Sequence, residues 1–180
     1  DSGEYYFHID KINGESIDLT KDPMWDAVGN KAKFMSDETR PRFNFGYSET
    51  HFAGGEKPGE LGGLFFRGDC RYPEKLAYYG AKTEMLTLSK SLRASGKVAF
   101  KRGVSDSTTL FGFFHAEHSV RVHDSQKTGM PSDFVGFAIE GPSAQGFYAY
   151  PCYRVHDGDS SSGYPENIPR IYPDGAPHTW

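Results

Sequence analysis

The sequence lacks long apolar runs and clusters of basic residues. No apolar run approaches the ~20 residues that span a bilayer, and the longest, such as residues 110–114, have the length of a strand. The 20 Lys and Arg residues are outnumbered by 24 Asp and Glu residues, for a net charge of −4. Nucleic-acid binding draws most of its affinity from neutralising phosphates. We therefore expect neither a membrane span nor a nucleic-acid partner.

Cysteine is scarce as well, with two residues in the 180 of the chain. Cys70 and Cys152 lie too far apart for a zinc motif or a C-x-x-C redox motif. Two interpretations stay open. The two residues could form one disulfide closing a long loop, worth roughly 4 kcal/mol in the chain-entropy model, or they could be separate buried thiols.

Signals of cellular location are few. The sequence contains no N-x-[ST] glycosylation site. It begins at Asp1 without Met, signal peptide or transit pattern. A processed, exported protein has this pattern, and so does an excised segment.

Aromatic residues and glycine are abundant by contrast. The chain contains 14 Phe, 11 Tyr and 21 Gly, and its aromatic share is 15%. Aromatic residues favour pleated strands, and glycine supplies tight turns between them. A chain of this length is expected to form one domain with one core. The composition therefore predicts a single all-β domain over residues 1–180.

Strand patterns recur along the chain, separated by turn residues. Residues 5–12 and 15–19 flank Asn13-Gly14, which predicts a hairpin with a type I′ turn. Phe43, Phe45 and Tyr47 alternate with polar residues or glycine, as expected for a strand with its aromatic rings on one face.

Later segments are predicted to pair as hairpins. Residues 97–102 and 109–117 flank a polar loop at 105–107, and residues 134–140 and 146–153 flank a turn at 141–143. Residues 85–92 fit either a strand or a short helix. Phe111 and Phe113 alternate with Leu110 and Phe114, so one face should enter a core and the other should be unusually aromatic. Such turn spacing, without intervening helical patterns, favours a sandwich or barrel.

Five short segments resemble the concanavalin A-like (laminin G-like) domains of secreted bacterial proteins. They are FGYSETHFAGG (45–55), GELGGLFFR (59–67), LRASGKVAF (92–100), FGFF (111–114) and IEGP (139–142). The resemblance covers roughly residues 22–180. It implies a two-sheet antiparallel jelly-roll sandwich and a secreted or cell-surface location reached by bacterial export. Since many members of this group are uncharacterised and the segments contain no catalytic signature, the resemblance supports fold more than function.

The last residues also resemble this family. Pro177 to Trp180 look like the start of a family strand in which Trp is followed by apolar-polar alternation. The resemblance therefore implies a domain that lacks its last strands. A sandwich without them exposes an unpaired edge, which another protein chain could cover.

The chemistry of related enzymes gives a weaker match. The family shares its fold with glucanases that carry Glu-x-Asp-x-x-Glu on one strand face, and this triplet is absent. His115, Glu117 and His118, with His123 nearby, form the richest ionisable cluster. On a strand, His115 and Glu117 would share a face and could act as an acid/base pair or bind a metal. They could equally be the polar end of a strand entering a loop.

A second polar cluster follows the final hairpin. Asp157 and Asp159 place carboxylates at alternate positions, as calcium loops do. The glycine falls one place late for an EF-hand, and Glu166 is out of register. A solvated loop and a structural calcium site are both compatible with this pattern.

Tyrosines provide the remaining signal. Their rings stack on the apolar faces of sugars, while charged side chains bind hydroxyls. A concave binding face is predicted from one set of residues: Tyr78, Tyr79, Tyr148, Tyr150, Tyr153, Arg71 and Arg154. Most of these rings could also be packing residues.

The first hypothesis for function is a secreted, non-catalytic module that binds a glycan or polysaccharide or mediates adhesion. The alternatives are a carbohydrate-active enzyme, either a polysaccharide lyase or a glycoside hydrolase, and a structural or assembly subunit of an extracellular complex.

Overall fold

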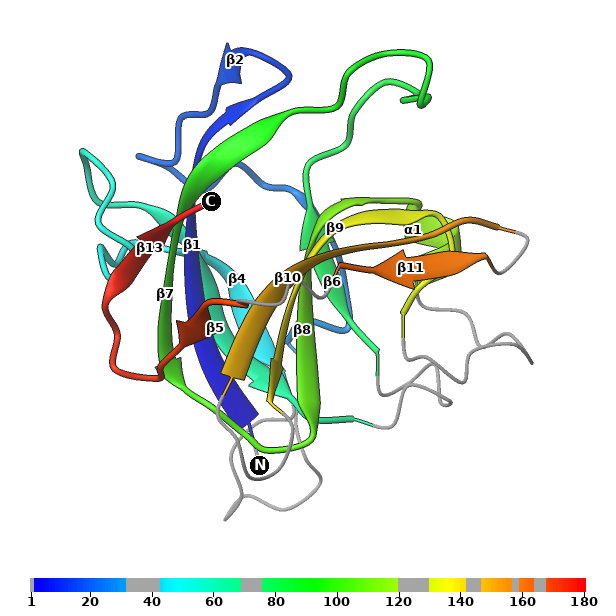
Figure 1. The fold of residues 1–180 in the computed structure, drawn as a ribbon. Helices are drawn as coiled ribbons and strands as arrows, with labels where there is room; N and C mark the ends of the chain where they lie inside the picture. The colour runs from blue at the N-terminus through cyan, green and yellow to red at the C-terminus, as the bar shows by residue number, and fades with distance from the viewer. Residues whose placement is uncertain are drawn as a thin grey trace.

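The protein is all-β, as the sequence predicts, and is built mainly from two antiparallel sheets (Figure 1). A computed structural model describes residues 2–31, 43–68, 76–119, 130–141, 147–156, 159–163 and 168–180. Within these ranges α1 (Ala116–Ser119) is one helical turn. No helix in the described part is long and apolar enough to cross a membrane.

The first sheet has the order β13-β7-β1-β5-β4, with β2 paired to β1. Its strands are β1 (Ser2–Ile12), β2 (Glu15–Ser16), β4 (Asn44–Ser48), β5 (Glu60–Phe66), β7 (Ala94–Arg102) and β13 (Pro177–Thr179). The predicted hairpin at Asn13-Gly14 is confirmed, because β1 pairs with β2 and both turn residues have positive φ, 50° and 90°.

The second sheet has the order β11-β10-β9-β8, with β12 also paired to β10. Its strands are β8 (Ser107–Phe114), β9 (Phe134–Gly141), β10 (Phe147–Arg154), β11 (Ser160–Ser162) and β12 (Arg170–Ile171). The predicted hairpin of residues 134–140 with 146–153 is confirmed as β9 and β10. Two further strands, β3 (Asp26–Val28) and β6 (Tyr78–Gly80), pair with each other.

Three local predictions were wrong. Residues 97–102 do not pair with residues 109–117, because β7 belongs to the first sheet and β8 to the second, so the chain crosses between sheets at residues 103–106. The strand predicted over 109–117 ends at Phe114, and α1 follows. Residues 85–92 form neither strand nor helix.

Aromatic rings from both sheets meet in the core, which makes the arrangement sandwich-like. Tyr5 stacks on Phe100 at a ring-centroid distance of 4.6 Å within the first sheet. Across the two sheets, Phe7 meets Phe111 at 4.9 Å and Phe100 meets Phe147 at 4.7 Å. Burying rings of this size supplies a large share of a domain's hydrophobic stabilisation.

The second sheet is apolar on its other face as well. Phe134, Ala138, Tyr150 and Cys152 form a second buried cluster, and Leu110 and Phe114 pack against it. Phe111 packs against the first cluster instead. The expectation that the alternate residues of this strand supply two apolar faces is therefore confirmed.

The connection from β4 to β5 folds back over the outer face of the first sheet. Glu60, 1% exposed, fixes it by accepting hydrogen bonds from the backbone N–H groups of Phe52 (2.9 Å) and Ala53 (2.8 Å) and from the hydroxyl of Thr50. Lys97 Nζ adds a bond of 2.7 Å to the carbonyl of Gly54. A single buried carboxylate thus replaces the sheet hydrogen bonds that this loop cannot make.

Glu60→Gln should lower the free energy of unfolding by about 2–3 kcal/mol, because an amide N–H₂ then faces backbone donors that lose their charged acceptor. Urea titration followed by circular dichroism measures the loss. Glu56→Gln is the control, since Glu56 is an exposed residue of the same loop, and it should change stability by less than about 0.5 kcal/mol. Equal effects of the two substitutions would contradict the anchoring role of Glu60.

Candidate functional site: a cleft between the sheets

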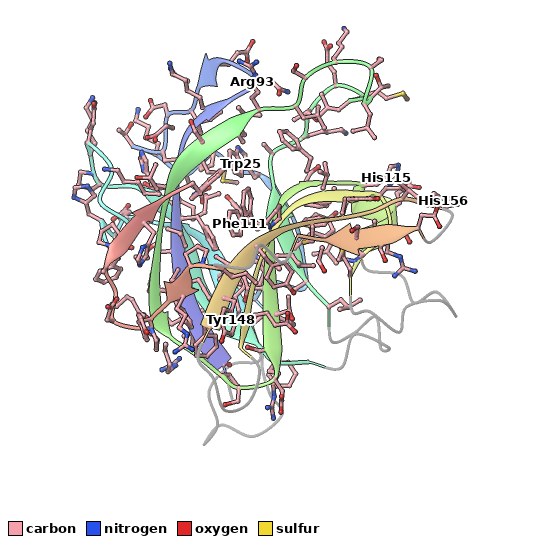
Figure 2. The ribbon with its side chains drawn as sticks, in the orientation of Figure 1. Trp25, Arg93, Phe111, His115, Tyr148 and His156 are labelled. Atoms are coloured by element: carbon pink, nitrogen blue, oxygen red, sulfur yellow. The ribbon has the colours of Figure 1, made fainter. Side chains whose placement is uncertain are left out.

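A cleft of about 1470 Å³ lies between the sheets and extends around β8. Its walls come from the core-facing sides of both sheets, from β3 and β6, and from the loop at residues 81–88. Figure 2 shows Trp25 and Phe111 in the space between the sheets. Side chains from segments distant in sequence therefore share one solvent-accessible space.

Three rings that line the cleft are called the cleft aromatics: Trp25, Tyr79 and Phe111. The rings of Trp25 and Tyr79 are 5.9 Å apart at an angle of 29°. Those of Phe111 and Phe137 are 5.7 Å apart at 17°, and the Phe137 side chain is 38% exposed. Trp180 meets Phe111 edge-on at 5.3 Å. Both ring pairs are close to parallel, so each offers flat apolar surface.

An acidic group accompanies the first ring pair. The hydroxyl of Tyr79 donates to Asp22 Oδ1 at 3.2 Å. Burial raises the pKa of Tyr79, and the negative charge of Asp22 raises it further. Tyr79 therefore stays protonated at neutral pH and remains a donor. Asp26, on β3, also lines the cleft.

Ionisable residues gather where β8 ends, and this polar end comprises His115, Glu117, Asp133 and His156. The backbone N–H of His115 donates to the carbonyl of Asp133 at 3.1 Å, and His156 Nδ1 lies 3.3 Å from Asp133 Oδ2. Asp133 has a positive φ of 55°, a conformation that aspartate tolerates better than most residues. The side chain of Asp133 is thereby placed between two histidine-bearing segments.

The prediction that His115 and Glu117 share a strand face was wrong. Strand β8 stops at Phe114, and Glu117 lies in the first turn of α1, exposed to solvent. Both residues still line the cleft. The side chain of His118 lies outside the described part, as does His123.

The predicted ligand-binding residues do not form one face. Tyr78, Tyr79 and Tyr153 line the cleft. Tyr148 and Tyr150 belong to the second apolar cluster, because alternation along β10 directs them to the opposite face from Tyr153.

Two members of this predicted set are buried. The Tyr150 side chain is 7% exposed, and its hydroxyl donates to Glu140. Arg154 lines the cleft but is 2% exposed, and its guanidinium donates to the carbonyl of Met130 at 2.8 Å. Arg71 lies outside the described residues. Burial makes Tyr150 and Arg154 structural residues rather than surface contacts for a ligand.

The proposed metal and disulfide residues are only partly described. Asp159 is exposed, while Asp157 lies outside the described part. Where the structure describes side chains, no three His, Cys, Asp or Glu residues converge as metal ligands do. Cys152 is a buried free cysteine, and Cys70 falls outside the described ranges.

Sequence reasoning missed several residues of the cleft. Trp25 follows a proline and precedes a strand of three residues, so no periodic pattern marked it. Asp133 precedes β9 and His156 follows β10, so they are far apart in sequence and meet only through the pairing of this hairpin. The alternation at Phe111 was recognised, but not that this ring would border an open space.

The thiol of Cys152 should resist modification in the native protein. Burial raises its pKa to about 11, with a smaller contribution from the charge of Glu140. A raised pKa favours the neutral thiol, which is unreactive far below that pH. With the labelled peptide identified by mass spectrometry, we expect Cys152 not to react with a thiol reagent at pH 8 in buffer, and to react fully in urea without reductant. A thiol that appears in urea only after reduction would instead indicate the disulfide.

Comparisons with known protein families, with curated proteins and with solved structures found no match for this chain.

Proposed function

We propose that this protein is a non-catalytic glycan-binding or adhesion module whose ligand occupies the cleft between the sheets. The observation that carries the proposal is the set of rings that line the cleft, Trp25, Tyr79 and Phe111, with the carboxylate of Asp22 hydrogen-bonded to Tyr79. The jelly-roll topology, the concanavalin A-like family and the secreted or cell-surface location rest on the sequence resemblance and are part of the same proposal.

The cleft aromatics suit a sugar ring in size and chemistry. A pyranose has apolar C–H faces that pack on aromatic rings and an equatorial belt of hydroxyls that needs hydrogen-bond partners. The hydroxyl of Tyr79 donates to Asp22 and so orients this carboxylate, which offers an acceptor for a sugar hydroxyl. The cleft of about 1470 Å³ has room for more than one sugar unit.

A calcium ion bound by Asp157 and Asp159 is the cofactor of this proposal. It would order the loop after β10, next to β11. Both carboxylates are hard oxygen ligands at alternate positions, which suits calcium.

A carbohydrate-active enzyme is the second candidate, favoured by the contact between Asp133 and His156. A carboxylate beside an imidazole can orient it and hold its proton, as a general base requires. The backbone N–H of His115 donates a hydrogen bond to the carbonyl of the same Asp133. A lyase or hydrolase would use this polar end while the aromatic rings hold the chain.

Trp25→Ala should weaken glycan binding by about tenfold, because a stacked ring is worth roughly 0.5–1.5 kcal/mol beyond its buried area, and Trp25 lines the cleft. The measurement is a glycan array, followed by titration of the best ligand against both variants. Tyr172→Ala is the matched control, since Tyr172 is 55% exposed and does not line the cleft, and it should bind as the native chain does.

The array is run with and without EDTA. Binding lost with EDTA supports the calcium site, and binding retained assigns affinity to the cleft aromatics alone. Absence of binding to every glycan under both conditions contradicts the proposed function. Turnover of a bound polysaccharide, abolished by Asp133→Asn, would favour the enzyme instead.

A further inference from the structure

Strand β8 is an edge strand, and its outer edge has no partner in the part of the chain that the structure describes. It ends the order β11-β10-β9-β8 and pairs with β9 alone. It is eight residues long, Ser107–Phe114, and runs along the cleft. An edge of this length presents a row of backbone donors and acceptors to whatever lies beside it.

The pairing register identifies which backbone groups are free. His115 and Asp133 continue the register of β8 with β9, and the N–H of His115 donates to the carbonyl of Asp133. In an antiparallel ladder, hydrogen-bonded residues alternate with residues that face the other side. The alternation therefore directs the N–H and C=O groups of four residues to the open edge: Thr108, Leu110, Gly112 and Phe114.

The other edges of the two sheets are blocked. At β4, the backbone N–H of Phe45 donates to the carbonyl of Asn30 at 2.9 Å, and the Asn30 amide donates back to Phe45 O at 2.6 Å. At the opposite edge, β13 has three residues and begins with Pro177, which has no N–H. Strand β11 is also three residues long.

Strand β8 has none of these protections. Its sequence, STTLFGFF, contains no charge and no proline, the two features that most often keep an edge from pairing. Thr108 and Gly112 are exposed. An uncharged, accessible edge of this length is what an added strand requires.

We infer that β8 is a docking edge for an extended polypeptide segment of a partner protein, which adds to the second sheet as a further strand. This goes beyond glycan binding, because it uses the backbone edge of β8 rather than the cleft aromatics. The guest strand would exchange hydrogen bonds with the four outward-facing residues.

The dimensions and the neighbours of β8 define the guest. A strand as long as β8 fills about 1300 Å³, from a rise of about 3.3 Å per residue, a strand spacing of about 4.8 Å and a sheet thickness of about 10 Å. The cleft of about 1470 Å³, which every residue of β8 lines, has room for it, so a guest strand and a bound glycan would compete for this space. Leu110 and Phe114 belong to the second apolar cluster. Guest side chains opposite them lie on the same face, so the guest carries apolar residues at every second position.

Hydrogen exchange tests the open edge directly. In the free protein, the amides of Thr108, Leu110, Gly112 and Phe114 should exchange fast, and those of Thr109, Phe111 and Phe113 slowly. Slow exchange of the first group in the dilute free protein contradicts the inference, because something already covers the edge. Protection that grows with protein concentration also contradicts it, since the partner is then a second copy.

The guest is then selected from a displayed library of random linear peptides. Bound peptides should slow exchange at the four outward amides, and N-methylation of alternate guest residues should abolish binding. Leu110→Pro should weaken binding by at least about tenfold, because proline removes a free donor and is tolerated where the N–H faces away from the sheet. Leu110→Val keeps the donor and should bind normally.

Slow exchange at Phe111 and Phe113 in Leu110→Pro shows that the strand still pairs with β9. A library that yields no binder, or peptides that protect other amides, overturns the inference. The exchange pattern of the free protein and the peptide selection do not depend on the glycan array, so failure of the glycan proposal and failure of this one are distinguishable.

Discussion

Contacts of one ring, that of Phe111, connect the two sheets at the cleft. From β8 it reaches Phe7 of the first sheet at 4.9 Å and Trp180, next to β13, at 5.3 Å. It also stacks on Phe137 within its own sheet at 5.7 Å. Ring pairs add stabilisation beyond the area they bury, and these contacts hold the two sheets face to face. Among the described residues, the outer edge of β8 is left unpaired.

The proposed glycan and the proposed guest strand use different groups of strand β8, because side chains and backbone groups alternate in direction along a pleated strand. Its odd-numbered side chains face the first sheet, where Phe111 supplies ring surface beside Phe137. Its even-numbered residues direct their backbone groups outward, where a polypeptide can pair. Ring surface suits an apolar sugar face, and free amides suit another strand. In the two proposals, one strand therefore serves both chemistries.

The sequence predicted features that depend on neighbouring residues and missed those that depend on distant ones. The Asn13-Gly14 turn and the β9–β10 hairpin were correct, because turn residues and alternation are local. The predicted pairing of residues 97–102 with 109–117 was wrong, because the short connection at residues 103–106 carries no sequence signal that the chain crosses to the other sheet.

The predicted ligand-binding residues show the same difference between local and long-range features. Tyr79 and Tyr153 do line the cleft, but alternation on β10 takes Tyr148 and Tyr150 to the other face. The contact of Asp133 with His156 forms only when β9 and β10 pair, so the sequence around either residue does not reveal it.

Entry of the ligand between the two sheets can be followed by fluorescence, because both tryptophans of the chain, Trp25 and Trp180, line that cleft. Acrylamide quenching of tryptophan fluorescence should therefore fall when the glycan found on the array binds. Binding that leaves emission and quenching unchanged would contradict the account.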